Sequence, residues 1–286
     1  MPSATQALHD RIALVFDFDQ TLAPDSLGAL LRRLGEDPDA FAREQVEPRS
    51  ADGWDTILAR CYALLEVSRA HDHAITKELL EAVGRELPLL DGLPDAFEGI
   101  RKAADAVAPG VSVEFYVLSA GFADIIEASP IAEHCTAIWG GTFLFGDDGR
   151  ILFPKRVITY GQKVRYLMAL AKGLGVQGHD APADVWRDVP AEDWYVPLDQ
   201  VVYVGDGASD LPAFHLMNEH GGFAIAVAKD VDESSWADEH DVHPNRRVLN
   251  VARADYTDGA ELQRSLCLAA ESAARLVALR RLGRGE

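Results

Sequence analysis

The apolar positions along the chain predict a parallel β-sheet. Residues 12–16 form a continuous run of Ile, Ala, Leu, Val and Phe, which is typical of a strand that is buried on both faces. Further apolar runs occupy residues 111–118, 201–204 and 224–227, with helical patterns between them. This alternation predicts an α/β fold whose core is a three-layer, Rossmann-like parallel sheet covered by helices.

The segment between the first two predicted strands indicates helices only. We expect them at residues 27–34, 40–45, 54–67 and 76–87. Within residues 54–67, apolar side chains recur at helical spacing, which indicates packing and not chemistry: Ile57, Leu58, Cys61, Leu64 and Leu65. This pattern predicts two domains, an α/β core of residues 1–24 and 91–286 and an inserted helical cap of residues 25–90.

The rest of the chain adds helices and a hairpin to the predicted core. Residues 95–108 and 164–171 have helical patterns, and residues 143–153 predict a β-hairpin around two glycines. Residues 174–199 are irregular and rich in aromatic and acidic residues, so we expect them to pack on the surface, with no role that the sequence reveals. An amphipathic pattern over residues 259–282 predicts a helix that closes the core.

Charge and cysteine content narrow the possible functions. The chain has 46 acidic and 27 basic residues, a formal net charge of −19, which disfavours binding to nucleic acid. The three cysteines are far apart and have no C-x-x-C spacing, so neither a zinc site nor a disulfide framework is indicated. No stretch approaches the length of a membrane span or a secretion signal, and we expect a cytoplasmic protein without membrane contact.

Polar signatures follow three of the predicted strands. Asp17 and Asp19 end the first apolar run, and ligands of parallel α/β sheets bind at this end of the strands. Two neighbouring acids repel each other by roughly 4 kcal/mol at about 4 Å and an effective dielectric near 20, so a positive partner is needed. A divalent metal is the simplest candidate, although a D-x-D pair alone is also compatible with acids that merely cap a loop.

The second strand is followed by small residues that suit an anion. Ser119, Ala120 and Gly121 come directly after it, and we expect a helix to begin there. Free backbone N–H groups at a helix start favour a phosphate, although a small-residue turn explains the same sequence. The third strand leads into Asp206 and Asp210, and Lys163 opens the helix before that strand.

The order and spacing of these signatures resemble the haloacid dehalogenase-like (HAD) hydrolase superfamily, specifically its phosphoserine phosphatase-like branch. The resemblance covers nearly the whole chain and includes the helical insertion, which corresponds to the cap of that family. Four motifs carry it: Asp17-Phe18-Asp19-Gln20-Thr21-Leu22, Leu118-Ser119-Ala120-Gly121, Lys163, and Gly205-Asp206-Gly207-Ala208-Ser209-Asp210. The first and the fourth are the most specific.

The resemblance implies a role for each matched residue in the hydrolysis of a small-molecule phosphate monoester. Asp17 is expected to be the nucleophile that forms an aspartyl-phosphate, with Asp19 as the general acid and base. Lys163 is expected to offset negative charge, and the remaining phosphate contacts are expected from Thr21, Ser119, Ala120 and Gly121. Mg²⁺ is the expected cofactor, held by Asp17, the backbone carbonyl of Asp19 and Asp206, with Asp210 orienting this set.

Other functions are compatible with the same motifs. A phosphomutase or other phosphotransferase on this fold is the nearest alternative, followed by a non-catalytic protein that binds a phosphorylated ligand. A response-regulator receiver domain also combines Asp, Ser or Thr and Lys on a parallel sheet, but it lacks both the helical insertion and the late G-D-x-x-x-D. The expected partner is a small phosphorylated metabolite, and the sequence reveals neither its identity nor the pathway nor the oligomeric state.

Overall fold

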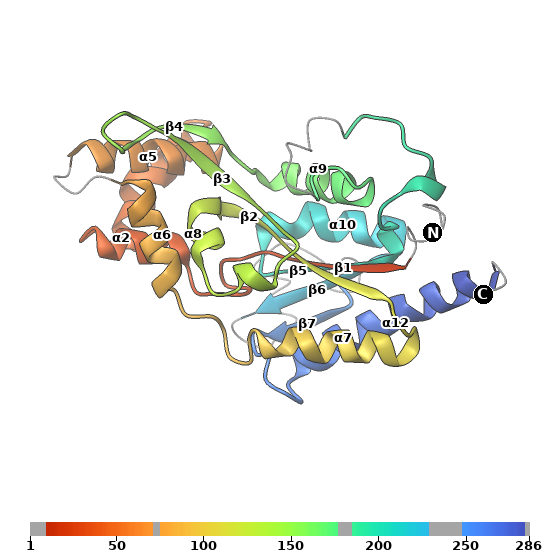
Figure 1. Ribbon diagram of the computed structural model, residues 1–286. Coiled ribbons are helices and arrows are strands. Elements are labelled where there is room, and N and C mark those ends of the chain that lie inside the picture. Colours follow the sequence, from red (N-terminus) through yellow and green to blue (C-terminus); the bar gives the residue numbers. More distant parts are fainter. Residues whose placement is uncertain (1–9, 71–74, 177–184, 229–247, 284–286) are drawn as a thin grey trace.

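The arrangement of the chain centres on a seven-stranded sheet (Figure 1). A computed structural model describes residues 10–70, 75–176, 185–228 and 248–283. Within these residues the strand order is β4-β3-β2-β1-β5-β6-β7. The strands are β1 (Arg11–Phe16), β2 (Ser112–Phe122), β3 (Ala137–Phe145), β4 (Ile151–Arg156), β5 (Val201–Gly205), β6 (Phe223–Ala228) and β7 (Asn250–Arg253).

The first predicted strand lies in the middle of this sheet. β1 pairs in parallel with β2 on one side and with β5 on the other, so that Val15 lies between Tyr116 and Tyr203. All described strand pairs are parallel except β3 with β4, which form an antiparallel hairpin at one edge. The predicted α/β fold with a mostly parallel sheet is therefore confirmed.

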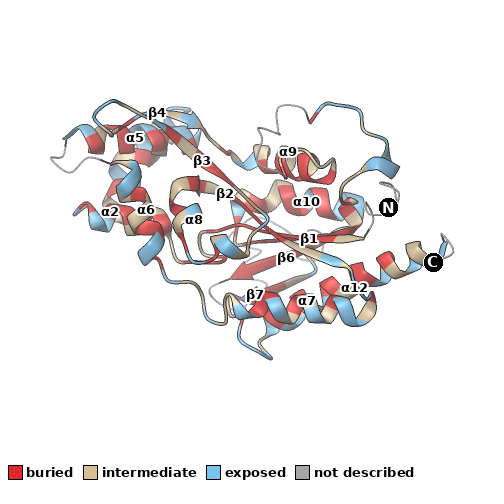
Figure 2. Ribbon diagram, viewed as in Figure 1, coloured by how far each residue is buried: buried red, intermediate tan, exposed pale blue. Residues whose placement is uncertain are grey.

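Alternate residues of β1 enter two hydrophobic layers, as the two-residue period of a strand requires. Leu14 and Phe16 pack toward α7 (Asp95–Val107) and α12 (Glu261–Gly283), whereas Val15 packs on the other face. That other face is covered by α9 (Tyr160–Ala171) and α10 (Leu211–His220). Figures 1 and 2 show the buried strands between these two pairs of helices, the predicted three layers.

Helices fill the segment between β1 and α7, as predicted. They are α2 (Ser26–Arg33), α3 (Pro38–Phe41), a π-helical turn (Ala42–Val46), α4 (Glu47–Ala51), α5 (Thr56–Ala70) and α6 (Lys77–Glu86). The short helix predicted at residues 40–45 is part of a longer helical stretch, in which α3, the π-helical turn and α4 follow one another without a break. Pro48 suits the first turn of α4, where a helix needs no backbone N–H donor.

These helices have a hydrophobic cluster of their own, which also includes Phe122 and Phe143 from β2 and β3. Cys61 is buried in this cluster, in agreement with its predicted packing role. Leu58 was expected in the same stripe but is 42% exposed, because it lies on the solvent side of α5. The cluster joins the helical segment to one end of the sheet, and the boundaries at residues 24 and 90 stay a prediction.

The second predicted strand continues further than expected. β2 does not end at Leu118 but reaches Phe122, and α8 (Ala123–Ala128) begins only after it. Leu118 pairs with Trp139 and Phe122 with Gly141, so β2 has two more residues than β3 between these pairs. Ser119, Ala120 and Gly121 therefore lie in a bulge, and the prediction of a helix start at Ser119 is wrong.

The remaining elements agree with the predictions or extend them. The predicted hairpin is formed by β3 and β4, but β3 begins at Ala137 and so belongs to the main sheet. β7 was not predicted. In the irregular segment, of which residues 177–184 lie outside the described chain, Tyr195 donates to Glu114 on β2 at 3.0 Å. No helix in the described part of the chain combines the length and apolar character that a bilayer span requires.

Candidate active site

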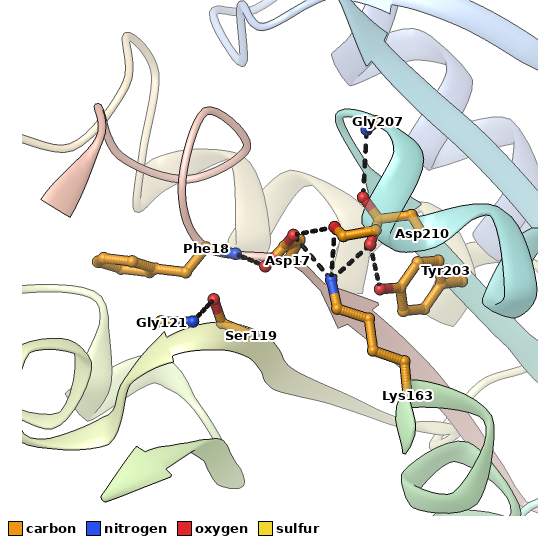
Figure 3. A network of polar contacts seen from close by, with 9 residues as sticks. Asp17, Phe18, Ser119, Gly121, Lys163, Tyr203, Gly207 and Asp210 are labelled. Atoms are coloured by element: carbon orange, nitrogen blue, oxygen red, sulfur yellow. Dashed lines mark hydrogen bonds and ion pairs between the residues drawn. The ribbon is translucent and has the colours of Figure 1, made fainter. Parts of the chain in front are cut away.

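Asp17 lies directly after β1, at the end of the sheet where the predicted site residues meet (Figure 3). Its backbone N–H donates to the Val204 carbonyl at 2.8 Å, so the chain still follows the sheet at this residue. Asp17 as a whole is 5% exposed, and the two oxygens of its carboxylate have different donors. Oδ1 accepts the Phe18 backbone N–H at 2.7 Å, and Oδ2 accepts from Lys163 Nζ at 2.8 Å. The side chain is thus fixed in one orientation.

Lys163 supplies the buried positive charge that the sequence requires. Its ammonium group is inaccessible to solvent and donates to Asp17 Oδ2 and to Asp210 Oδ1, the latter at 2.6 Å. A third, longer contact of 3.3 Å reaches Ser209 Oγ. Burial alone would lower the pKa of Lys163, but the charges of Asp17 and Asp210 raise the pKa above its ordinary value. Lys163 is therefore a permanent cation at the centre of the site.

Asp206 adds a further carboxylate to this group. Oxygen atoms of Asp17, Asp206 and Asp210 lie within 4.8 Å of one another. When all are ionised, these three carboxylates and the Lys163 ammonium group have a net charge of −2. Burial, reinforced by Asp17 and Asp210, raises the pKa of Asp206 to about 8. Burial also raises the pKa of Asp17, against the opposing effect of Lys163.

This donor set fits Mg²⁺. Hard carboxylate oxygens are the ligands that Mg²⁺ prefers, and one divalent cation would neutralise the excess of two negative charges. Asp17 and Asp206 would hold the ion. Asp210 is less suited, because it is inaccessible to solvent and its Oδ1 accepts two hydrogen bonds, from Lys163 and Tyr203, while Oδ2 accepts the Gly207 N–H. The outer role of Asp210 and the metal contact of the Asp19 carbonyl both remain predictions.

A tight loop brings Asp19 to the same end of the sheet. The Phe18 carbonyl accepts the backbone N–H groups of the third to fifth residues after it, and Gln20 takes a positive φ of 59°. Asp19 Oδ1 accepts the Ser26 N–H at the start of α2, at 2.8 Å. Burial raises the pKa of Asp19 to about 6, although the bond from Ser26 opposes this effect. A carboxyl group with such a pKa can both give and take a proton near neutral pH.

Gly121, in the β2 bulge, lies close to the other oxygen of Asp19. A side-chain carbon at residue 121 would lie 3.0 Å from Asp19 Oδ2 and 3.3 Å from Ser119 Oγ. The Gly121 N–H donates to Ser119 Oγ at 3.0 Å, which leaves the Ser119 proton for another acceptor. The structure thus brings Ser119 and Gly121 beside Asp19, but it does so with a strand bulge in place of the predicted helix start.

Thr21 is buried, and its hydroxyl has no hydrogen-bond partner among the described residues. Its backbone carbonyl accepts the hydroxyl proton of Tyr256 at 2.8 Å, so the main chain is well held. The predicted contact between Thr21 and a phosphoryl oxygen therefore remains a prediction, as do those of Ala120 and Lys163.

The sequence did not reveal Ser26, Tyr203 and Ser209 as site residues. Tyr203 donates its hydroxyl to Asp210 Oδ1 at 2.6 Å, and Ser209 Oγ lies 3.4 Å from Asp17 Oδ2. A tyrosine inside an apolar run is a usable signal, since a buried hydroxyl needs a partner. The Ser26 contact has no comparable signal, because it depends on where the loop after Asp19 returns.

Comparison of the sequence with known proteins gives a distant similarity and no family. No family model matches the chain. An uncharacterized protein of Borreliella burgdorferi strain B31 is 23% identical over 278 residues, which cover 88% of this chain and 93% of that protein. The similarity therefore extends over most of the chain, but it indicates no function, because the relative is uncharacterized.

Solved structures of HAD-family hydrolases and phosphoserine phosphatases have a similar fold. A probable phosphoserine phosphatase from Vibrio cholerae superposes with a TM-score of 0.56 and 17% identity, covering 96% of this chain and 69% of that one. A HAD-family hydrolase from Salmonella enterica serovar Typhi gives 0.53 and 19%, covering 79% and 65%. A phosphoserine phosphatase in a phospho-aspartyl intermediate analogue gives 0.51 and 18%, covering 84% and 95%. This chain has the HAD-like fold, as the motifs predicted.

Proposed function

We propose that this protein is a phosphatase that hydrolyses a small-molecule phosphate monoester through an aspartyl-phosphate intermediate. The observation that carries the proposal is the contrast between two neighbouring carboxyl groups. Asp17 is bonded to the permanent cation Lys163, whereas Asp19 accepts a neutral backbone N–H and has a pKa raised to about 6. Two carboxyl groups with different environments suit two different chemical roles.

In the first step an oxygen of Asp17 attacks phosphorus, and the bond between phosphorus and the ester oxygen breaks. Asp19, in its protonated form, gives its proton to the departing oxygen, so that the leaving group departs as an alcohol. The Phe18 N–H and Lys163 hold the Asp17 carboxylate during this step. Ser119 Oγ and Asp19 Oδ2 both lie beside Gly121, and the Ser119 hydroxyl would donate its proton to a phosphoryl oxygen.

In the second step a water molecule attacks the phosphorus of the aspartyl-phosphate. Asp19, now ionised, takes a proton from this water, and the bond between Asp17 and phosphorus breaks. The products are free Asp17, protonated Asp19 and inorganic phosphate. Bound Mg²⁺ would reduce the repulsion between the Asp17 carboxylate and the phosphate dianion.

The helices of residues 25–90 support a role as a cap that selects the substrate. α2 begins at Ser26, whose N–H holds the proposed acid and base Asp19. A movement of α2 would therefore shift Asp19 directly. Closure of the helical cap over the substrate would exclude water from the site. We take the substrate to be a small phosphorylated metabolite in the cytoplasm, since a net charge of −19 disfavours a nucleic acid.

Phosphate release tests this function. The purified protein is incubated with Mg²⁺ and a panel of phosphorylated metabolites and aryl phosphates, with Asp17→Asn as the control. We expect release from at least one ester by the wild type, no release by Asp17→Asn and no release in excess EDTA. Isomerisation of an ester without release of phosphate, dependent on a bisphosphate primer, would identify a phosphomutase instead, and a wild type inactive on every ester would contradict the proposal.

A further inference from the structure

Three carboxylates compete for two positive partners in this site. Asp17, Asp206 and Asp210 have oxygens within 4.8 Å of one another, and carboxylates do not differ in their intrinsic affinity for Mg²⁺ or for an ammonium group. Lys163 nevertheless bonds Asp17 and Asp210. A contact of Asp210 with its surroundings must therefore fix Lys163, and not a metal, as its partner.

Tyr203 donates a hydrogen bond to Asp210 and so distinguishes it from the other two carboxylates. Its hydroxyl donates to Asp210 Oδ1 at 2.6 Å, the same oxygen that accepts from Lys163 at 2.6 Å (Figure 3). Oδ2 accepts the Gly207 backbone N–H at 3.2 Å. With three donors and no solvent exposure, Asp210 is satisfied by the protein alone.

The surroundings keep this arrangement in place. Tyr203 is buried in β5, and its ring packs edge-on against Phe214 of α10 with 5.7 Å between the ring centres. Gly205 follows on the same strand, and a side-chain carbon there would lie 2.3 Å from Asp210 Cγ. The Asp210 carboxylate thus lies against the strand itself, within reach of the tyrosine hydroxyl, because residue 205 has no side chain.

We propose that Tyr203 is a positioning residue, which keeps Asp210 bonded to Lys163 and away from the metal. The inference rests on the proposed function in that Lys163 must remain against Asp17 for the chemistry to occur. Without the Tyr203 hydroxyl, Asp210 Oδ1 has a vacant lone pair beside the other two carboxylates. A cation is then drawn toward Asp210, and Lys163 loses its fixed place between the two acids.

Tyr203→Phe tests this role because it removes only the hydroxyl and retains the ring. The matched control is Tyr116→Phe. Tyr116 is equally buried, lies beside Val15 on the other side of β1, and donates its hydroxyl to the Glu114 carboxylate. Both variants lose one bond from a buried tyrosine to a carboxylate, so we expect similar losses of melting temperature. The Glu114 contact lies outside the site, and Tyr116→Phe should retain wild-type turnover.

Two readouts separate positioning from a merely structural role. First, Mg²⁺ is titrated against melting temperature without substrate, and the half-saturating concentration should fall about threefold in Tyr203→Phe, because a third carboxylate becomes available. Second, kcat for an aryl phosphate should fall about tenfold, the effect of a lost hydrogen bond to a charged group, with KM changed much less. Tyr116→Phe should match the wild type in both measurements.

The outcomes separate this inference from the proposed function. The Mg²⁺ titration needs no turnover, so it decides the role of Tyr203 even if the wild type hydrolyses no ester. An unchanged half-saturating concentration in Tyr203→Phe would overturn the inference, and so would a kcat equal to that of Tyr116→Phe in an active enzyme. If Tyr203→Phe did not fold, Asp210→Asn would replace it. Mg²⁺ should still stabilise Asp210→Asn, whereas it should no longer stabilise Asp206→Asn. An Asp210→Asn variant that Mg²⁺ did not stabilise would again overturn the inference.

Discussion

Lys163 Nζ lies 2.8 Å from Asp17 Oδ2, although the two residues are 146 positions apart in the sequence. Lys163 has no solvent exposure and the Asp17 side chain has 7%, so water cannot replace either partner. A buried ion pair of this kind adds little stability compared with apolar residues, but removal of one partner is costly. The site therefore depends on all of its charges being present together.

Replacement of Lys163 should destabilise the whole protein. Lys163→Met leaves Asp17 and Asp210 buried without their cation, which should lower the free energy of unfolding by about 3–5 kcal/mol. Urea denaturation without metal measures the change. Lys102→Met is the control, since Lys102 is 75% exposed and faces Glu98 at 3.6 Å, and it should cost less than about 1 kcal/mol. Equal losses in the two variants would contradict the burial argument.

Stability in the absence of metal should fall as the pH rises. Burial raises the pKa of Asp206 from 3.8 to about 8 and that of Asp19 to about 6, so the folded chain binds these protons more tightly than the unfolded chain. Folding is then favoured at low pH and loses stability as the pH rises through this window. Melting temperatures in EDTA between pH 5 and about 8 should show the fall.

Two comparisons identify the groups responsible for this pH dependence. Mg²⁺ stabilises the ionised form of Asp206, so its addition should reduce the fall most at the upper end of the range. In Asp206→Asn the melting temperature should no longer fall at the upper end of the pH range. The fall below about pH 6 that the ionisation of Asp19 causes should remain. A melting temperature that rose with pH in EDTA would show that these carboxyl groups do not dominate.

Two helical glycines should respond in opposite ways to an added methyl group. In α6, a side-chain carbon at Gly84 would lie 2.1 Å from the Ile125 carbonyl oxygen of α8, so Gly84→Ala should cost about 1–3 kcal/mol through forced separation of the helices. In α9, Gly161 has no such neighbour within 4 Å among the described residues, and Gly161→Ala should gain up to about 1 kcal/mol. Urea denaturation of both variants gives the comparison, and a stabilised Gly84→Ala would mean that α6 and α8 are less closely packed.

The sequence predicted which residues meet because parallel strands end at the same edge of a sheet. Asp17 and Asp206 each follow a core strand and Ser119 lies in the bulge of β2, and their convergence requires only that these strands are neighbours. Lys163 was predicted to join them from the helix before the third of these strands, and it does so with a direct bond to Asp17. The apolar runs and strand ends therefore determined most of the site.

Features that depend on pairing between distant segments were not predictable in this way. The continuation of β2 through Gly121 follows from its bonds with β3, whose first half contains adjacent glycines that give no strand signal. The different environment of Asp210 depends on Lys163, 47 positions away, and on the hydroxyl of Tyr203. Spacing in the sequence identifies such carboxylates as candidates, but only side-chain contacts assign them to different partners.

The last prediction concerns the two acids that follow β1. Asp17→Asn removes the attacking oxygen, so no phosphoenzyme should form with any ester. Asp19→Asn retains the nucleophile. With an aryl phosphate, whose leaving group needs little protonation, the first step should still occur, but the water in the second step has lost its general base.

Phosphoenzyme should therefore accumulate in Asp19→Asn and be seen as the added mass of one phosphoryl group after rapid acid quenching. Product release should stop at or below one equivalent of enzyme, while an alkyl phosphate should give no burst, because its leaving group requires the proton that Asp19 supplies. The Ser26 N–H contact gives a further check, since the side-chain oxygen of the substituted asparagine can still accept it and the loop should stay in place. A burst of equal size in Asp17→Asn and Asp19→Asn, or a phosphorylated Asp17→Asn, would mean that the nucleophile lies elsewhere.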